Sequence, residues 1–445
     1  MLTDRFGLPL TMSSAAARDA YVAGVDCVIS ADTGAIEHLS AALAADPDFA
    51  MAHAALARWY FLIADIPAAK AAAKRARELS SSISEREQSH INALCLPLEG
   101  RGGEAWAATQ AHVASYPRDA MIVSLGAGVF SLIGFSGRQE REAEQIAFLD
   151  AVRPHLADDW WFQSFYAFAL GEFGRHQEAL AIVERSMVAN PRNAHGAHIK
   201  AHVLYELGED EMALHYLDAW LPNYGREGLM HCHLSWHVAL SALALGDTAR
   251  AWQVYEQQVQ PGGAWGPPLN VATDAPAFLW RAELAGEKRN LAHWHRLRDY
   301  TDKAFPKSGI GFVDVHRALT RATTANGMGI AEFVAELEEI APRSPMGTVV
   351  PQLARGFAAY EAGDWPQAIA VLQPALAQTV RIGGSRAQRD LVLGTLIAAY
   401  LRSGQSGAAA TSRLSPKPAA SPLRERRGRS AMWRAPSMRS RPARN

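Results

Sequence analysis

The chain has 445 residues, of which 49% are apolar and 20% are charged. This composition is typical of a folded protein and excludes a long disordered chain or a collagen-like fibre. Its 44 basic and 45 acidic residues give a formal net charge of −1, which argues against nucleic acid or an anionic membrane as a partner for the body of the chain.

The cysteines and the N-terminal segment bear on the compartment. Cys27, Cys95 and Cys232 lie far apart without a CxxC pair, so neither a disulfide framework nor a thiolate zinc site is indicated. The first 14 residues lack a basic stretch that leads into an apolar one, as a secretory signal requires. The uncharged apolar run 121–135 is shorter than the roughly 20 residues that span a bilayer. We therefore expect a cytoplasmic protein without a membrane partner.

Alanines recur along the chain at a nearly constant period. A glycine stands five residues before several of them, at Gly100, Gly174, Gly208 and Gly246, and a proline stands twelve residues after others, at Pro47, Pro117 and Pro191. A period of 34 to 38 residues is that of helical repeats. The alanines are Ala35, Ala69, Ala105, Ala143, Ala179, Ala213 and Ala251.

Each period predicts one hairpin of two helices. The glycine closes the first helix in a left-handed conformation, the alanine allows the two backbones to approach, and the proline ends the second helix. Residues 126–128 (Gly-Ala-Gly) fall within a run that we interpret as helical, with close helix packing. The pattern resembles the tetratricopeptide repeat, and it predicts an all-α fold, an α-solenoid of tetratricopeptide-like helix hairpins over residues 1–405.

The later repeats are less regular. Residues 278–286 and 312–322 are predicted to be first helices of degenerate hairpins, and the Pro- and Gly-rich loop 260–268 is the expected break. Gly363, Trp365 and Ala368 repeat the regular pattern once more, and Tyr400 with Gly404 predicts the first helix of a final unit.

Residues 406–445 have a different composition. They hold ten basic residues and one acidic residue, which leaves 34 basic and 44 acidic residues, a charge near −10, in residues 1–405. The segment alternates Pro, Ser and Arg without an apolar period, so we expect a disordered basic tail. A basic arm for acidic partners, a tail without function, and an end created by a lost reading frame stay open. Deleting 406–445 is expected to leave the thermal midpoint nearly unchanged.

Histidines gather in one part of the chain: seven of the sixteen lie between positions 195 and 237. His198 and His202 are four apart and share a helix face, and Glu206 follows four residues later. On the next hairpin His233 and His237 have the same spacing, with Trp236 between them. We expect both pairs on first helices, meeting across the concave groove of the solenoid.

Other polar and aromatic residues are predicted to complete this groove. One wall comes from the preceding hairpin and the opposite wall from the degenerate ones. The predicted groove residues are Trp161, Glu172, His198, His202, Glu206, His233, Trp236, His237, Asp274, Asp314 and His316.

Several chemistries fit these side chains. His198, His202 and His237 are candidate ligands for a divalent metal such as zinc, and a histidine near a carboxylate suits a general base. The same histidines also suit a wall of residues hydrogen-bonded to one another that stabilises packing or binds a polar partner. The sequence holds no HExxH, GxSxG or phosphate-binding GxxxxGK[ST] motif.

Six segments, in order and spacing, resemble the tetratricopeptide repeat protein 38 family over roughly residues 4–405. They are DRFGLPL at 4–10, HIKAHVLYELGE at 198–209, HLSWHVALSALALGD at 233–247, DAPAFLWRAELAGE at 274–287 and FVDVHRAL at 312–319; AALAADPDFAMAHAALA at 41–57 ends the first hairpin. The resemblance implies an all-helical repeat protein without an assigned activity. It also implies recurring positions at His202, Glu206, Trp236, His237, Asp274, Asp314 and His316. The basic tail departs from the family pattern.

Two functions follow as expectations. The leading one is a binding or scaffold protein without a cofactor, which recognises a peptide, a protein or a small polar ligand in its groove. The alternative is an enzyme, a metal-dependent hydrolase that uses His202, Glu206, His237 and His316 with Asp274 or Asp314. An open groove favours the first, and an enclosed site favours the second, because catalytic charge needs shielding from water. A large separation of His202 from His237 would exclude a shared metal ion.

Overall fold

The structure is a computed structural model that describes residues 2–324 and 328–414. Those residues form α-helices and no β-strand, apart from one isolated bridge between Thr3 and Pro9. The all-α solenoid of tetratricopeptide-like hairpins predicted from the alanine period is therefore confirmed.

The helices follow one another along the chain as a series of hairpins. The first group comprises α1 (Ala15–Ser30), α2 (Ala35–Ala45), α3 (Ala50–Leu62), α4 (Ile66–Leu79), α5 (Glu85–Leu98), α6 (Gly102–Ser115) and α7 (Ala120–Val123). The second comprises α8 (Arg141–Leu156), α9 (Trp160–Glu172), α10 (His176–Ala189), α11 (Ala194–Leu207), α12 (Asp210–Trp220), α13 (His231–Leu245) and α14 (Thr248–Val254). The third comprises α15 (Pro268–Leu284), α16 (Leu291–Ala304), α17 (Gly311–Thr324), α18 (Met328–Ile340), α19 (Val349–Glu361), α20 (Trp365–Ala375), α21 (Arg386–Arg402) and α22 (Ser406–Leu414).

Short helical turns extend some of these helices. The turns η1 (Ser80–Ser82), η2 (Leu221–Asn223), η4 (Ala341–Arg343) and η5 (Leu376–Ile382) are 3-10 helices, and η3 (Tyr255–Val259) is a π-helix.

The glycines and alanines that mark the repeat have the conformations and positions that the sequence predicts, with one exception. Gly100, Gly174, Gly208 and Gly246 all have φ between 75° and 98°, the left-handed conformation that ends a first helix. The alanines lie on the second helices, where Ala69, Ala105, Ala179 and Ala251 are fully buried against the first helices. Ala143 is the exception, since it is exposed on α8.

The exposure of Ala143 has a cause in the segment before it. The prediction of a helical run around residues 126–128 is wrong, because α7 ends at Val123 and turns follow as far as residue 136. Gly134 shows why the chain turns there: a Cβ added to Gly134 would lie 2.1 Å from the carbonyl oxygen of Val129. The hairpin of α8 thus lacks a long first helix.

The later hairpins have first helices where the sequence predicts them, but the bounds of these helices differ from the predicted ones. The structure has first helices at both predicted places, α15 and α17, but α15 begins at Pro268, ten residues before the expected start at 278. The Pro- and Gly-rich segment after η3 forms the turns that separate α14 from α15, as expected for a break.

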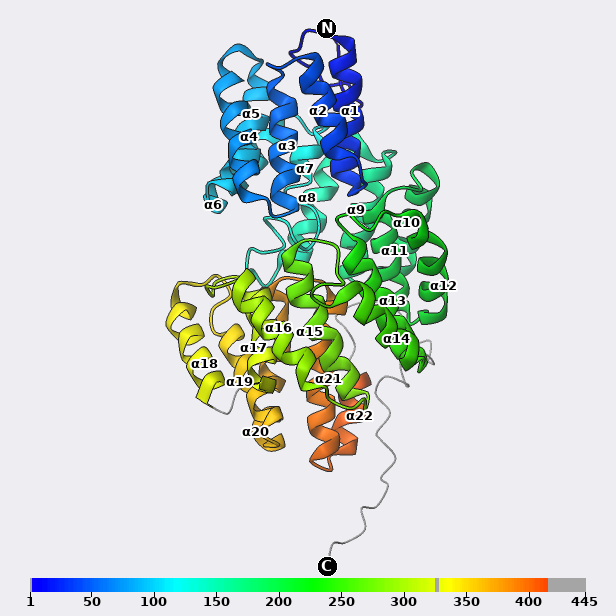
Figure 1. Ribbon diagram of the computed structural model, residues 1–445, viewed down its shortest axis with the longest axis vertical. Coiled ribbons are helices and arrows are strands. Elements are labelled where there is room, and N and C mark those ends of the chain that lie inside the picture. Colours follow the sequence, from blue (N-terminus) through cyan, green and yellow to red (C-terminus); the bar gives the residue numbers. More distant parts are fainter. Residues whose placement is uncertain (1, 325–327, 415–445) are drawn as a thin grey trace, which may run out of the picture.

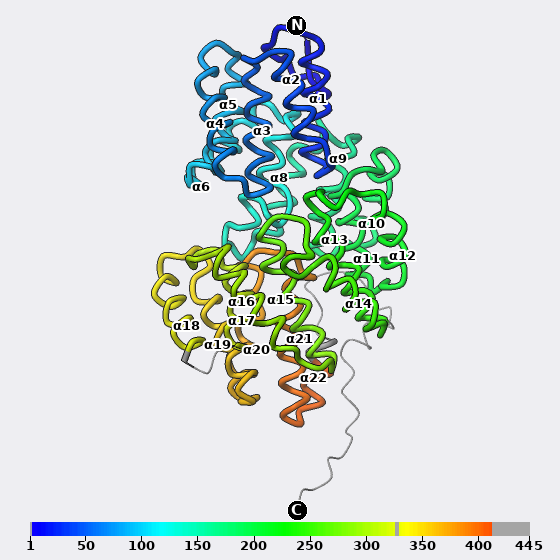
Figure 2. Tube along the Cα trace, viewed as in Figure 1, coloured from blue at the N-terminus to red at the C-terminus, as the bar shows by residue number. Residues whose placement is uncertain are grey.

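The solenoid closes on itself. Figure 1 shows α1 to α6 at one end, α15 to α22 at the other, and α21 beside α15, against which it packs. The turns before α8 reach the lower helices in Figure 2. At the start of α8, the guanidinium of Arg141 donates to the carbonyls of Val380 and Gly384, at 2.7 and 2.6 Å, about 240 positions later in the chain. Helix α21, which follows these residues, packs against α11 and α15.

The boundary of the predicted tail needs a correction. Residues 406–414 form α22, which packs on α21 and buries Ala409, so the last hairpin has a second helix where none was expected. The missing apolar period is the reason for the error, because small alanines suffice to pack so short a helix. The rest of the predicted tail, 415–445, lies outside the described residues.

Within residues 2–324 and 328–414, no helix combines the length and the apolar character that crossing a bilayer requires.

Candidate functional site

The eleven predicted groove residues all lie on first helices, and all are buried. Each has at most 6% of its surface exposed, with His198 the most exposed of them. The helices are α9, α11, α13, α15 and α17. The prediction that these residues sit on first helices is correct, but they face an enclosed interior and not an open groove.

Four of the residues form a compact centre, which we call the four-histidine centre: His198, His202, His233 and His237. One ring nitrogen from each lies within 4.8 Å of the others. The Nε2 atoms of His198 and His233 are 2.9 Å apart, and those of His202 and His237 are 3.2 Å apart. The two histidine pairs therefore meet, as their spacing predicts.

Helix geometry produces this arrangement. A spacing of four residues puts both histidines of a pair on one face, one turn apart. The hydrogen-bonded partners are 35 positions apart, which is one repeat, so they occupy equivalent places on α11 and α13. Two successive repeats thus each contribute one pair to the centre.

Burial sets the protonation of the centre. The pKa values of His198, His202 and His237 are held well below 6.5, first by loss of hydration and then by the charges of neighbouring histidines. These imidazoles are neutral near pH 7. A neutral imidazole has a lone pair on one nitrogen, which is the form that accepts a hydrogen bond or binds a metal.

Asp274 on α15 orients the centre. Its Oδ2 lies 2.7 Å from Nδ1 of His233, and its Oδ1 accepts from the side-chain amide of Gln388 at 3.4 Å. Trp236 stacks on the ring of His233, with centroids 5.3 Å apart, and the guanidinium of Arg281 lies 5.6 Å from the centroid of Trp236. Asp274, which the sequence places on the opposite wall of the groove, thus contacts one of the histidines directly.

Two predicted carboxylates lie beside the centre. Glu206 is buried one turn beyond His202, and its charge interacts with that of Glu172 on α9. Glu172 accepts from the backbone N–H of Arg386 at 2.9 Å and from the guanidinium of Arg389 at 3.3 Å. Burial raises the pKa of Glu172 to about 7, although the two arginines oppose this shift.

The remaining three predicted residues are not part of the four-histidine centre. Trp161 packs against Phe165, with ring centroids 5.4 Å apart, at the opposite end of α9 from Glu172. His316 places Nδ1 2.7 Å from the carbonyl oxygen of Phe312, one turn earlier on its own helix.

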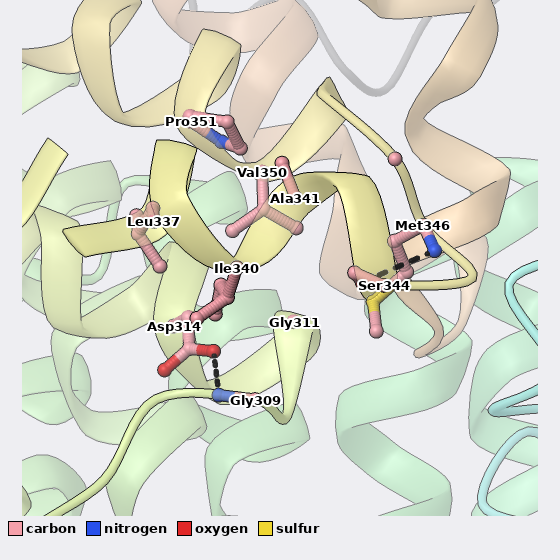
Figure 3. A pocket seen from close by; sticks show the side chains of 11 residues that line it. Gly309, Gly311, Asp314, Leu337, Ile340, Ala341, Ser344, Met346, Val350 and Pro351 are labelled. Carbon is pink, nitrogen blue, oxygen red and sulfur yellow. Dashed lines mark hydrogen bonds between the residues drawn. The ribbon is translucent and has the colours of Figure 1, made fainter. Parts of the chain in front are cut away.

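Asp314 faces a different part of the molecule. It accepts from the backbone N–H of Gly309 at 2.8 Å and from Arg317 at 3.2 Å, and it lines a small cavity with Leu337 and Met346 (Figure 3). The expectation that Asp314 forms a wall of the groove with the histidines does not hold, because its side chain is turned toward α18 and α19.

Sequence reasoning missed the residues of α21. Arg386, Gln388 and Arg389 are buried. The two arginines contact Glu172, and Gln388 contacts Asp274. No spacing in the sequence connects them to their partners, which precede them by 114 to 217 positions.

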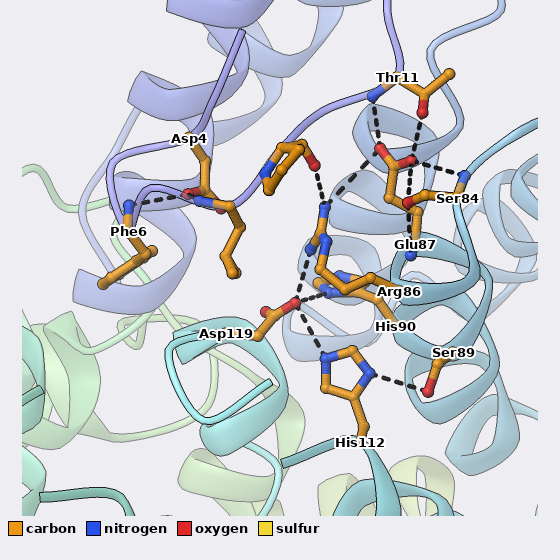
Figure 4. A network of polar contacts seen from close by, with 12 residues as sticks. Asp4, Phe6, Thr11, Ser84, Arg86, Glu87, Ser89, His90, His112 and Asp119 are labelled. Atoms are coloured by element: carbon orange, nitrogen blue, oxygen red, sulfur yellow. Dashed lines mark hydrogen bonds and ion pairs between the residues drawn. The ribbon is translucent and has the colours of Figure 1, made fainter. Parts of the chain in front are cut away.

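A second buried polar group was also missed. Asp119 Oδ2 accepts from Arg86 at 2.9 Å and lies 2.8 Å from His90 and 3.2 Å from His112 (Figure 4). Although burial would raise the pKa of Asp119, these three neighbours hold it well below 3.8. The group lies under the N-terminal segment, where Arg86 also donates to the carbonyl of Pro9 at 2.9 Å.

No protein-family model matches the chain. Among solved structures, it is similar to human IFIT1 in a dimer with m7Gppp-AAAA, at 12% identity and a TM-score of 0.44 over 92% of this chain and 96% of that one. It is also similar to a tetratricopeptide repeat protein from Parabacteroides merdae ATCC 43184, at 14% identity and a TM-score of 0.28 over 70% and 98% of the two chains. Yeast Tom70 matches at 12% identity and a TM-score of 0.30 over 90% and 99%. At these identities the likeness is one of fold alone.

Proposed function

We propose that this chain is a helical-repeat binding protein that encloses a small polar ligand or an ion at the four-histidine centre. The observation that carries this proposal is the burial of the four histidines and of Asp274, whose Oδ1 accepts from Gln388 of α21. A peptide is recognised along an exposed strip of surface, so burial favours a small occupant over a peptide or protein partner.

Unpaired polar atoms support a small occupant. Nδ1 of His202 and the indole N–H of Trp236 are buried and have no hydrogen-bond partner within the described part of the chain. Buried polar groups nearly always find a partner in protein, water or ligand, because leaving one unpaired costs about 1–3 kcal/mol. Both atoms belong to residues of the centre or in contact with it.

Mass spectrometry tests the proposal. Protein prepared without an affinity tag is incubated with the low-molecular-weight fraction of a cell extract, and its native and denatured masses are compared. We expect an excess mass in the wild type and in the exposed-residue control His215→Ala, and none in His202→Ala/His237→Ala. A folded wild type that carries no bound species would contradict the proposal.

A hydrolase is the second candidate, and one observation favours it. The centre is shielded from water, and the 3.2 Å between the Nε2 atoms of His202 and His237 lets one ion reach both. Hydrolysis of chromogenic ester, amide and phosphoester substrates tests this function. Activity that disappears in Glu206→Gln and persists in Glu211→Gln, an exposed carboxylate, would support it.

Family and location complete the proposal. The six segments named above support membership of the tetratricopeptide repeat protein 38 family, and the three scattered cysteines support a cytoplasmic location. Fractionation of cells that produce the protein, with antibody detection, tests the location.

A further inference from the structure

We propose that the occupant of the four-histidine centre is a divalent transition-metal ion such as Zn²⁺, coordinated by His198, His202, His233 and His237. This inference rests on the proposed function and specifies its ligand. It also assigns a role: with four protein ligands the ion is coordinatively saturated, so it holds two successive repeats together and does not activate water.

The four nitrogens are close enough to converge on one ion, since all lie within 4.8 Å of one another. Zinc binds imidazole nitrogen at about 2.0–2.1 Å in a tetrahedron, which places neighbouring ligand nitrogens about 3.3 Å apart. The Nε2 atoms of His202 and His237 already lie 3.2 Å apart, and those of His198 and His233 need to separate by roughly 0.4 Å from 2.9 Å. Side-chain torsions absorb a shift of this size.

The tautomer of one ligand is fixed for coordination. Nδ1 of His233 lies 2.7 Å from Oδ2 of Asp274, and a carboxylate accepts hydrogen bonds, so a metal-binding His233 keeps its proton on Nδ1 and directs the lone pair of Nε2 toward His198. A carboxylate behind a metal-binding histidine is the usual outer-shell arrangement, and it orients the ring and increases its basicity. Asp274 is therefore a positioning residue.

Charge in the surroundings balances a cation. Asp274 contacts the centre directly, and Glu206 lies one turn from His202, so carboxylates are present on two helices. The positive charge of Arg281 would repel a cation, but its guanidinium is turned toward the carbonyls of Ala387 and Gln388, at 2.6 and 3.2 Å.

The donor type selects the class of metal. Imidazole suits Zn²⁺, Cu²⁺, Ni²⁺ and Fe²⁺, whereas Mg²⁺ and Ca²⁺ prefer oxygen ligands. Because the ligands come in pairs from α11 and α13, a bound ion cross-links these helices. The expected physical effect is a higher thermal midpoint of the full chain.

Metal titration tests the inference. Tag-free protein is stripped with a chelator and titrated with Zn²⁺ and with Co²⁺, whose visible absorption reports tetrahedral nitrogen coordination. We expect one equivalent to bind, the tetrahedral Co²⁺ spectrum to appear, and the thermal midpoint to rise. Asp274→Asn should weaken binding by about 10–100-fold, and each single His→Ala change in the centre by at least as much.

The controls separate the outcomes. His215→Ala, an exposed histidine on α12, should bind metal as the wild type does. Folding of every variant is checked by circular dichroism, and Asp274→Asn keeps the test valid if the alanine variants fail to fold. Binding that survives loss of His202 and His237, or the absence of one-equivalent binding by the folded wild type, overturns the inference. An organic species in the mass measurement without metal overturns the inference but leaves the proposed function standing.

Discussion

The carboxylate of Glu172 accepts a hydrogen bond from the backbone N–H of Arg386, 214 positions later in the chain, at 2.9 Å. The guanidinium of Arg386 in turn donates to the carbonyl oxygen of Glu172 at 2.7 Å. This reciprocal pair joins the end of α9 to the start of α21. The same helix also reaches the surroundings of the four-histidine centre, because the side-chain amide of Gln388 donates to Asp274 at 3.4 Å.

The first prediction concerns Arg389, which bridges two carboxylates at this closure. Its guanidinium contacts Glu142 at 2.6 Å and Glu172 at 3.3 Å. Arg389→Met removes the buried cation and leaves both acids without it, so the free energy of unfolding should fall by about 3–5 kcal/mol. Denaturant unfolding measures this change. The control is Arg355→Met, from the exposed pair with Glu338, which should cost at most about 1 kcal/mol; equal losses would refute the closure.

The second prediction is a pH dependence that originates in Glu172. Burial raises the pKa of its carboxyl group from 4.5 to about 7, so the folded protein binds this proton more tightly than the unfolded chain does. The contribution to stability is complete below about pH 4.5 and is lost as pH rises toward about 7.

Glu172→Gln tests this sign. The glutamine does not titrate, so the unfolding free energy of the wild type relative to the variant should fall by on the order of 2 kcal/mol between pH 5 and pH 8. Denaturant unfolding at a series of pH values gives the curve. The exposed control Glu211→Gln should leave the wild-type profile unchanged. A difference that is flat with pH would show that Glu172 is ionised in the folded state throughout.

The third prediction addresses the polar group under the N-terminal segment. Asp119→Ala leaves Arg86, His90 and His112 without their shared acceptor, and the buried cation of Arg86 then keeps only the more distant carboxylate of Glu87, at 3.8 Å. We expect a loss of about 3–5 kcal/mol in unfolding free energy. Asp48→Ala, from an exposed pair with Arg75, should cost about 1 kcal/mol or less. Similar values for the two variants would contradict a structural role for Asp119.

The fourth prediction compares two shortened chains, one that ends at Gln405 and one that ends at Leu414. Only the longer chain keeps α22, which packs on α21 and buries Ala409. Loss of α22 exposes the apolar face of α21, so the chain that ends at Gln405 should melt several degrees lower. Calorimetry measures both midpoints. Equal midpoints would restore the boundary expected from the sequence.

Most of the fold was predictable because its signals are local. The glycines at positions such as 174 and 208 end helices by their own backbone conformation, and the buried alanines mark helix crossings within a single hairpin. The prediction failed around residues 124–136 and at α22. There, close contacts of glycine and packing of small side chains outweigh the apolar period.

The candidate site, too, was predicted where its signals are local and missed where tertiary packing decides. Spacings of four determined that His198 shares a face with His202, and His233 with His237, because helix geometry acts within one turn. The sequence also predicted the first helices that carry Glu172, Asp274 and Asp314. It did not predict that Asp314 turns away from the histidines, since its direction depends on the packing of α18 and α19.

By itself, the sequence determined the repeat, the hairpins and the two histidine pairs, all of which follow from interactions over a few residues to one repeat. Only the tertiary structure decided that the histidines are enclosed and that Arg386 and Arg389 contact Glu172. Curvature of a solenoid accumulates from a small rotation at every repeat, so the contacts between α9 and α21 depend on all the hairpins between them. No pattern within one repeat therefore predicts the contacts between α9 and α21.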